Sequence, residues 1–120
     1  MKRLTKGEEQ IMMVLWNHGS GLLMELVEKM PNPLPHKNTV ATILKILVDK
    51  GFVNIEIVGR FHRYHAAITK EEYTTRTLTS VVKDYFKGSF SNAVSFLVET
   101  EKLSLADLEL LLKQLKNNSK

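Results

Sequence analysis

The chain has 120 residues, 43% of them hydrophobic and 25% charged, which is enough for one compact unit or for a small domain with an added oligomerisation element. It contains no cysteine, so disulfides, thiolate metal sites and cysteine nucleophiles are excluded. The net charge is +4, mostly from residues 1–68, where nine Lys and Arg stand against six Asp and Glu; a surplus this mild fits a nucleic-acid partner without establishing one.

The sequence also argues against a membrane protein. No apolar run approaches the roughly 18–20 residues that a transmembrane helix needs. The first five residues are partly basic, but no apolar stretch follows them, so we expect no signal peptide. These features predict a cytoplasmic protein that does not insert into a membrane.

Two helices are expected near the start of the chain. Thr5 and Glu8 form the capping-box pattern that begins a helix, apolar residues at helical spacing follow, and Gly19 ends the pattern. A second, short helix is expected around residues 22–30, and Pro31 ends it because proline cannot continue a helix.

The third predicted helix is the most informative segment. It begins near residues 36–38, after a proline-rich connection, and runs to Lys50, with Gly51 as the residue that follows its end. One of its faces is apolar, at the i, i+3, i+4 and i+7 spacing of Val40, Ile43, Leu44 and Leu47.

The hydrophobic period then changes from 3.6 to 2. Residues 52–58 alternate between apolar and polar, residues 60–65 do so less regularly, and Gly59 lies between them, which predicts a β-hairpin. Three helices followed by a hairpin is the order of a winged helix-turn-helix. We therefore expect a mainly α fold with a small β-hairpin wing, in which residues 1–68 form a winged-helix DNA-binding domain.

The side of the third helix that lies opposite its apolar face is the main candidate for a DNA-binding surface. This side also includes Asp49 further along, but near the N-terminal end of the helix its side chains are short, polar or basic, as close approach to base edges in a major groove requires. Thr39 lies on the flank near the helix start, where hydroxyl and amide groups bind phosphate. Every surface helix has a polar outer face, so the signal depends on the hairpin beside it. The candidates are Lys37, Asn38, Thr39, Ala41, Thr42 and Lys45.

Two arginines of the hairpin extend this candidate surface. Arg60, at the tip, is placed to enter a minor groove or to contact a phosphate, and Arg63 is a further phosphate contact, as is Lys37. The alternative for Arg60 is a solvated turn whose charge only favours solubility.

Residues 69–120 predict a helical region that pairs with a second copy of the chain. Thr69 and Glu72 form another capping box, and helical stretches around residues 91–98 and after Ser104 follow. These helices expose more apolar surface than they can cover alone, and a second copy is the simplest cover. The residues expected in this dimerisation domain's interface are Leu78, Val82, Tyr85, Phe86, Val94, Leu97, Leu108, Leu111, Leu112 and Leu115.

Nothing in the sequence supports catalysis or metal binding. There is no glycine-rich phosphate loop, no nucleophile elbow and no convergent set of Ser, His and Asp. His62 and His65 lie three residues apart in a predicted strand, so they point to opposite faces and cannot share one ion. We expect no enzyme activity, no metal site and no cofactor.

Several runs of residues, spread over nearly the whole chain, together resemble the penicillinase-repressor family. They are residues 4–12 with Leu15 and Trp16, residues 39–47 with residues 50–53, Arg60 and Tyr64, residues 71–73, and residues 97–99 with Leu103 and Ser104.

The resemblance implies a homodimer that binds a palindromic operator on double-stranded DNA, with the third helix in the major groove. It also implies repression, commonly of β-lactam-resistance genes, and release when a membrane sensor-protease cuts the C-terminal region. Family members inactivated in this way are typically cut at an Asn-Phe bond, whereas the aligned bond here joins Phe96 and Leu97. The copper-responsive branch carries C-terminal cysteines, which this chain lacks.

Two other functions remain open from the sequence. One is a winged-helix regulator that still binds DNA but is released by a small ligand between its dimerisation helices. The other is a winged-helix module that binds proteins and no nucleic acid.

Overall fold

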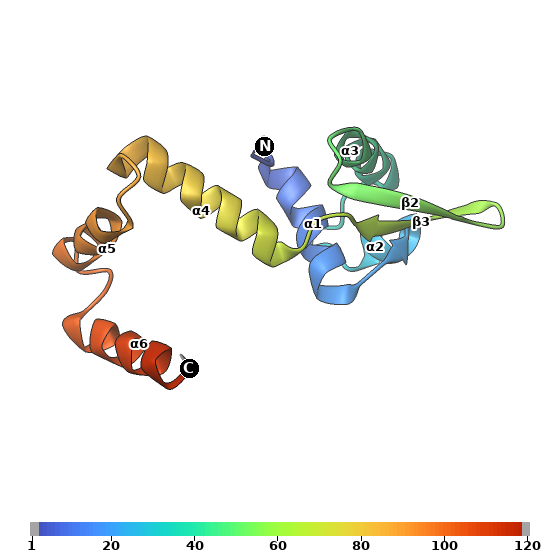
Figure 1. Cartoon of the computed structure of the whole chain (residues 1–120). Helices are drawn as coiled ribbons and strands as arrows, with labels where there is room; N and C mark the ends of the chain where they lie inside the picture. The colour runs from blue at the N-terminus through green and yellow to red at the C-terminus, as the bar shows by residue number, and fades with distance from the viewer. Residues whose placement is uncertain (1–2, 119–120) are drawn as a thin grey trace. The chain divides into compact units, whose positions relative to one another are not determined.

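The computed structural model describes residues 3–118, which divide into two compact units, one up to Arg76 and the other from Thr77 onward. The first unit holds three helices, a small sheet and the beginning of a fourth helix (Figure 1). In chain order its elements are α1 (Lys6–His18), β1 (Gly21–Leu22), α2 (Leu23–Glu28), α3 (Lys37–Asp49), β2 (Val53–Val58), β3 (Phe61–Ala66) and the first residues of α4 (Lys70–Phe86).

The first unit is a winged helix, as the order of predicted elements indicated. Strands β2 and β3 form the expected antiparallel hairpin, whose register pairs Val53 with Ala66 at one end and Val58 with Phe61 at the other. The short strand β1 adds a third, unexpected strand on the free edge of β3, so the sheet order is β1-β3-β2. The hairpin extends well beyond the helices of this unit and forms the wing (Figure 1).

The core of the first unit lies where α1, α2 and α3 meet the base of the wing. The apolar face predicted for α3 is buried there, because Val40, Leu44 and Leu47 are inaccessible and Ile43 is partly buried against them. The opposite side of α3 is consequently left facing solvent, as a helix with one apolar stripe requires.

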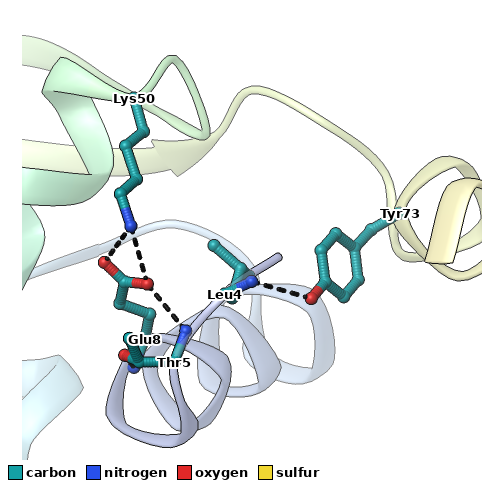
Figure 2. A network of polar contacts seen from close by, with 5 residues as sticks. All are labelled: Leu4, Thr5, Glu8, Lys50 and Tyr73. Carbon is teal, nitrogen blue, oxygen red and sulfur yellow. Dashed lines mark hydrogen bonds and ion pairs between the residues drawn. The ribbon is translucent and has the colours of Figure 1, made fainter. Parts of the chain in front are cut away.

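A buried carboxylate fixes the start of α1 against the end of α3. Thr5 and Glu8 form the predicted capping box: the Thr5 hydroxyl accepts from the Glu8 amide at 3.2 Å, and the Glu8 carboxylate accepts from the Thr5 amide at 2.8 Å. Glu8 is only 4% exposed, and Lys50 donates to both of its oxygens at 2.8 and 3.0 Å. Figure 2 shows this carboxylate between the Lys50 ammonium and the Thr5 amide.

These contacts decide the ionisation of Glu8. Burial alone would raise the pKa of its carboxyl, but the hydrogen bonds from Lys50 and from the Thr5 amide, together with the positive charge of Lys50, lower that pKa below its usual value. Glu8 is therefore held as a carboxylate.

The first unit continues past residue 68, where the sequence placed the domain boundary. Tyr73 of α4 is buried in the first unit's core, and its hydroxyl accepts from the Leu4 amide at 3.1 Å (Figure 2). Trp16 packs partly buried beside it, with ring centroids 5.7 Å apart, and donates from its indole nitrogen to the Ile68 carbonyl at 2.9 Å. The opening turn of α4 therefore packs with the winged helix.

The second unit consists of the rest of α4, α5 (Phe90–Glu99) and α6 (Leu105–Asn118). Its helices share one internal aromatic contact, between Phe86 and Phe96 at 5.5 Å, but its surface carries many exposed large apolar side chains. Of the residues assigned to a dimer interface, Val82 is already buried within one chain, and Phe86 is half-buried. Among the described residues, no helix combines the length and apolar character that crossing a bilayer needs.

Candidate nucleic-acid interface

The start of α3 is fixed by a histidine cap. His36 has extended backbone angles, and its Nδ1 accepts a hydrogen bond from the Asn38 amide at 3.1 Å, which satisfies one of the free amides of the first turn. The His36 carbonyl accepts from the Thr39 and Val40 amides at 3.0 and 3.2 Å. These hydrogen bonds therefore set the conformation of the exposed first turn of α3, where the candidate contacts begin.

The structure places the predicted residues of α3 on one outward side of that helix. Ala41 is half-buried, and its small side chain allows a close approach to another surface. The others are exposed, namely Lys37, Asn38, Thr39, Thr42 and Lys45.

The Thr42 hydroxyl has a defined orientation. It donates to the Asn38 carbonyl one turn earlier at 2.9 Å, so its hydrogen is engaged within the helix. Because Thr42 is exposed, its oxygen can still accept a hydrogen bond, which suits an amino group on a base edge, such as those of adenine or cytosine. Lys45, one turn further along, supplies an ammonium group with no carboxylate partner in the part of the chain that the structure describes.

The tip of the wing is a two-residue turn. Gly59 has a φ of +63°, a left-handed conformation that glycine adopts without steric cost, and this closes the strand pair between Val58 and Phe61. Arg60 follows it in the turn and is exposed. The position predicted for Arg60 from sequence is thus the one that the structure shows.

Arg63 lies in a different environment from Arg60. It sits within β3, directly opposite Glu56 of β2, with 3.9 Å between Nε and the nearer carboxylate oxygen. His65 also contacts that oxygen, at 3.0 Å. A phosphate contact by Arg63 would compete with Glu56, a pairing that the sequence analysis missed because it depends on the register of the hairpin.

The structure brings two of the predicted cations together. Lys37 of α3 and Arg60 of the wing line the same groove, although they are far apart in the sequence. Sequence analysis missed the apolar residues that complete the groove, among them Met24 and Phe61, because exposed apolar side chains give no periodic signal.

A larger hollow lies at the other end of α3. It has a volume of about 670 Å³ and is lined by both acidic and basic side chains, including Asp49, Glu72 and Arg76. Lys50 also lines it, but its ammonium is bound to Glu8. Because acidic and basic side chains are mixed, the hollow favours neither an anionic nor a cationic ligand. The described residues contain no group of three or more His, Asp or Glu placed to hold a metal ion.

Two sequence comparisons show which known proteins the whole chain resembles. The family model described as penicillinase repressor matches residues 4–117. The penicillinase repressor of Bacillus licheniformis is 25% identical over 122 residues, which cover 98% of this chain and 95% of that protein.

Solved structures resemble the chain as well. The monomeric form of Bacillus licheniformis BlaI, determined in complex with the blaP half-operator, is 26% identical and matches with a TM-score of 0.51 over 60% of this chain and 89% of its own. Bordetella bronchiseptica BpsR, whose DNA binding is regulated by 6-hydroxynicotinic acid, matches over 98% of this chain and 76% of its own, with a TM-score of 0.50. At 15% identity, that second likeness concerns the fold alone.

Proposed function

Because the chain belongs to the penicillinase repressor family, we propose that it is a transcriptional repressor that binds a palindromic operator as a homodimer. Each copy places the outer side of α3 in a major groove and its wing against the flanking backbone. A repressor that acts on chromosomal DNA works in the cytoplasm, which is where we place this one.

The outer side of α3 is the observation that supports this proposal most strongly. It presents short polar side chains around Thr42, a cation at Lys45 and an N-terminal turn capped by His36, and a basic wing tip lies in the same unit. The match to BlaI, whose structure was determined on a half-operator, gives a DNA-bound precedent for this fold at 26% identity.

The mechanism is steric occupation of a promoter. Lys and Arg contacts to phosphates supply much of the affinity, and the exposed residues of α3 supply the discrimination between sequences. Two half-sites one helical turn apart, about 34 Å, are bound together only if two copies are joined. Joining them makes the second contact intramolecular and raises the operator affinity well above that of a single copy.

In this proposal the helices of the second unit form the dimer interface. Tyr85 is 77% exposed and Leu105 68% exposed in the single chain, and further leucines of α6 are about half exposed. Exposed apolar surfaces of this kind usually mark interaction sites. In a symmetric dimer, the same surface of each copy is buried against the other.

Release by proteolysis is the regulation that family membership suggests, with a membrane sensor-protease as the partner and β-lactam-resistance genes as the regulated set. The aligned bond, Phe96–Leu97, lies in the last turn of α5. The Phe96 carbonyl accepts from the Thr100 amide at 3.0 Å and from the Thr100 hydroxyl at 2.8 Å. A protease that reads an extended segment must therefore open this turn before it cuts.

A titration with DNA from upstream of the chain's own gene tests the proposed function. We expect retardation in a gel that weakens steeply with salt, since phosphate contacts release counterions. No retardation at low salt would instead favour a module that binds proteins.

A second experiment addresses regulation. Incubation with a sensor-protease encoded nearby should release a C-terminal fragment and abolish operator binding together. Release of the operator by a small molecule, with the chain intact, would instead support the ligand-controlled alternative.

A further inference from the structure

Tyr73, in the first turn of α4, attaches that helix to several other parts of the first unit. Its ring is buried against Trp16 of α1, with 5.7 Å between ring centroids, and against Phe52, just before β2, with 6.0 Å. Its hydroxyl accepts from the Leu4 amide at 3.1 Å (Figure 2). The same hydroxyl donates to Glu9 Oε2 at 3.4 Å. One side chain of α4 therefore contacts the chain before α1, α1 itself and the base of the wing.

Phe52 extends this attachment to α3. Its ring is buried, and its amide donates to the Leu47 carbonyl of α3 at 2.9 Å. Leu47 is itself inaccessible in the same core. The end of α3, the helix that the proposed function places in the major groove, is therefore linked through Phe52 to the ring of Tyr73.

The short connection from β3 into α4 is held as well. The Ala67 amide donates to the Phe52 carbonyl at 2.8 Å, and the Ile68 carbonyl accepts from the Trp16 indole at 2.9 Å. The Thr69 hydroxyl accepts from an amide of the first turn at 3.0 Å and so caps α4. Each of the three residues between the strand and the helix therefore has a hydrogen bond that limits its rotation.

The direction of α4 at its first turn matters because the helix is long. It runs unbroken from Lys70 to Phe86. At about 1.5 Å per residue, the part of it from Tyr73 to Phe86 spans about 20 Å, and a tilt of about 10° at Tyr73 displaces its far end by about 3.5 Å. This displacement is close to one base-pair step, about 3.4 Å, since ten base pairs span about 34 Å.

We propose that Tyr73 is a positioning residue for operator binding: it holds the first turn of α4 to the winged helix and thereby sets the half-site spacing that the dimer accepts. This inference rests on the proposed function and adds the residue that couples dimerisation to the placement of α3. Tyr73 is buried, so it acts through α4 and touches no DNA. Its loss should change which spacings are bound and leave the contact of each copy with its own half-site intact.

The test uses the full chain and duplexes in which the two half-sites of the upstream operator keep their natural spacing or are moved apart by one, two or three base pairs. Each added base pair shifts one half-site by about 3.4 Å and turns it by about 34° around the duplex. The unmodified chain should lose at least about tenfold in affinity when two base pairs are added. Tyr73→Leu, which removes both the ring and the hydroxyl, should lose less than about threefold.

A duplex with a single half-site separates positioning from a general defect. Tyr73→Leu should bind it within about twofold of the unmodified chain and should remain a dimer in sedimentation experiments. Its affinity for the naturally spaced operator should fall about fivefold, because its two copies are no longer held at the matching separation.

Two further variants make the result interpretable. Tyr73→Phe keeps the ring and loses only the hydroxyl contacts with Leu4 and Glu9, so its spacing penalty should lie between the other two. It decides the test alone if circular dichroism shows that Tyr73→Leu is unfolded. Leu26→Ala destabilises the same core from α2, and it should keep the full spacing penalty at a temperature where it is folded.

Several results would overturn the positioning role. One is a full spacing penalty in both Tyr73 variants, or an unmodified chain that tolerates the added base pairs. Another is a loss of half-site affinity as large as the loss of operator affinity, because that would show only a weakened winged helix. A third is equal relaxation in Leu26→Ala. Failure of the unmodified chain to bind the upstream duplex, or to dimerise, would instead overturn the proposed function.

Discussion

At the scale of single residues, substitutions of Thr42 and Lys45 test whether the outer side of α3 binds DNA. Thr42→Val keeps the side-chain shape but removes the acceptor oxygen, and Lys45→Ala removes the unpaired ammonium group. We expect each to weaken operator binding by about 1–3 kcal/mol, the usual value of one specific contact. Titration of each variant against the upstream duplex measures this.

Both residues are exposed, so their loss should leave folding intact, and thermal unfolding monitored by circular dichroism provides the control. Thr42→Val should reduce the preference for operator over scrambled DNA, whereas Lys45→Ala acts through charge and also reduces the salt dependence. Unchanged operator affinity in both variants would show that this side of α3 does not face DNA.

Glu8 links the stability of the first unit to pH. Its pKa is lowered in the folded chain by Lys50 and the Thr5 amide, which outweigh burial. A lowered folded pKa adds stability above the unfolded pKa of about 4.3, and this stability is lost as the pH falls through the folded value. Glu8→Gln should therefore cost about 2 kcal/mol near pH 7, and its stability should depend less steeply on pH below about pH 4.3.

Urea unfolding at pH 7 and at pH 4 measures both effects. Glu28→Gln serves as the control, because Glu28 is an exposed carboxylate of the same unit, and this substitution should leave the stability at pH 7 unchanged. A Glu8→Gln chain that is as stable as the unmodified one at pH 7 would show that the contact with Lys50 contributes nothing.

At the scale of elements, helix α6 provides a matched pair of leucines for testing dimerisation. Leu112 lies on the leucine-rich side of α6 that the sequence assigns to the interface, and Leu110 lies about 200° around the helix from it. The two are almost equally exposed in the single chain, at 54% and 56%. Leu112→Asp should yield monomers in sedimentation experiments and weaken operator binding at least tenfold.

Leu110→Asp should leave the dimer and its operator affinity intact. Dimers in both variants would argue against this side of α6 as the interface. Monomers in both would show that the substitution disrupts the helix rather than a specific face.

The elements differ in how far the sequence alone predicts them. The bounds of α3 follow closely from its apolar spacing, because one face of a long amphipathic helix must be buried. Strand β1 could not be predicted, since it has two residues and forms only by pairing with Tyr64 and Arg63 of β3. Position 21 favours glycine, because a Cβ there would lie only 2.9 Å from a Leu26 side-chain carbon and would clash with it.

The candidate site shows the same limit. The outward residues of α3 and the tip position of Arg60 follow from local periodicity and turn chemistry. The partners of Arg63 and the burial of Tyr73 depend on contacts between distant segments, which a periodic pattern does not encode. A capping box predicts where α4 begins, but not that its first turn packs with the winged helix.

At the scale of the whole molecule, the proposed mechanism of repression requires two copies of α3 on one duplex. The proposed function assigns the joining of the copies to the apolar helices of the second unit and the reading of the DNA to the polar outer side of α3. Neither suffices alone, because a single winged helix makes too few contacts to occupy a promoter stably.

A hydroxyl-radical footprint of the full chain on DNA upstream of its own gene is the most direct test of this account. We predict two protected regions of related, inverted sequence, their centres separated by about 10 base pairs or a multiple of that turn. Both regions should appear at the same protein concentration, because the joined copies bind together. A single protected region, or protection without inverted symmetry, would contradict the account.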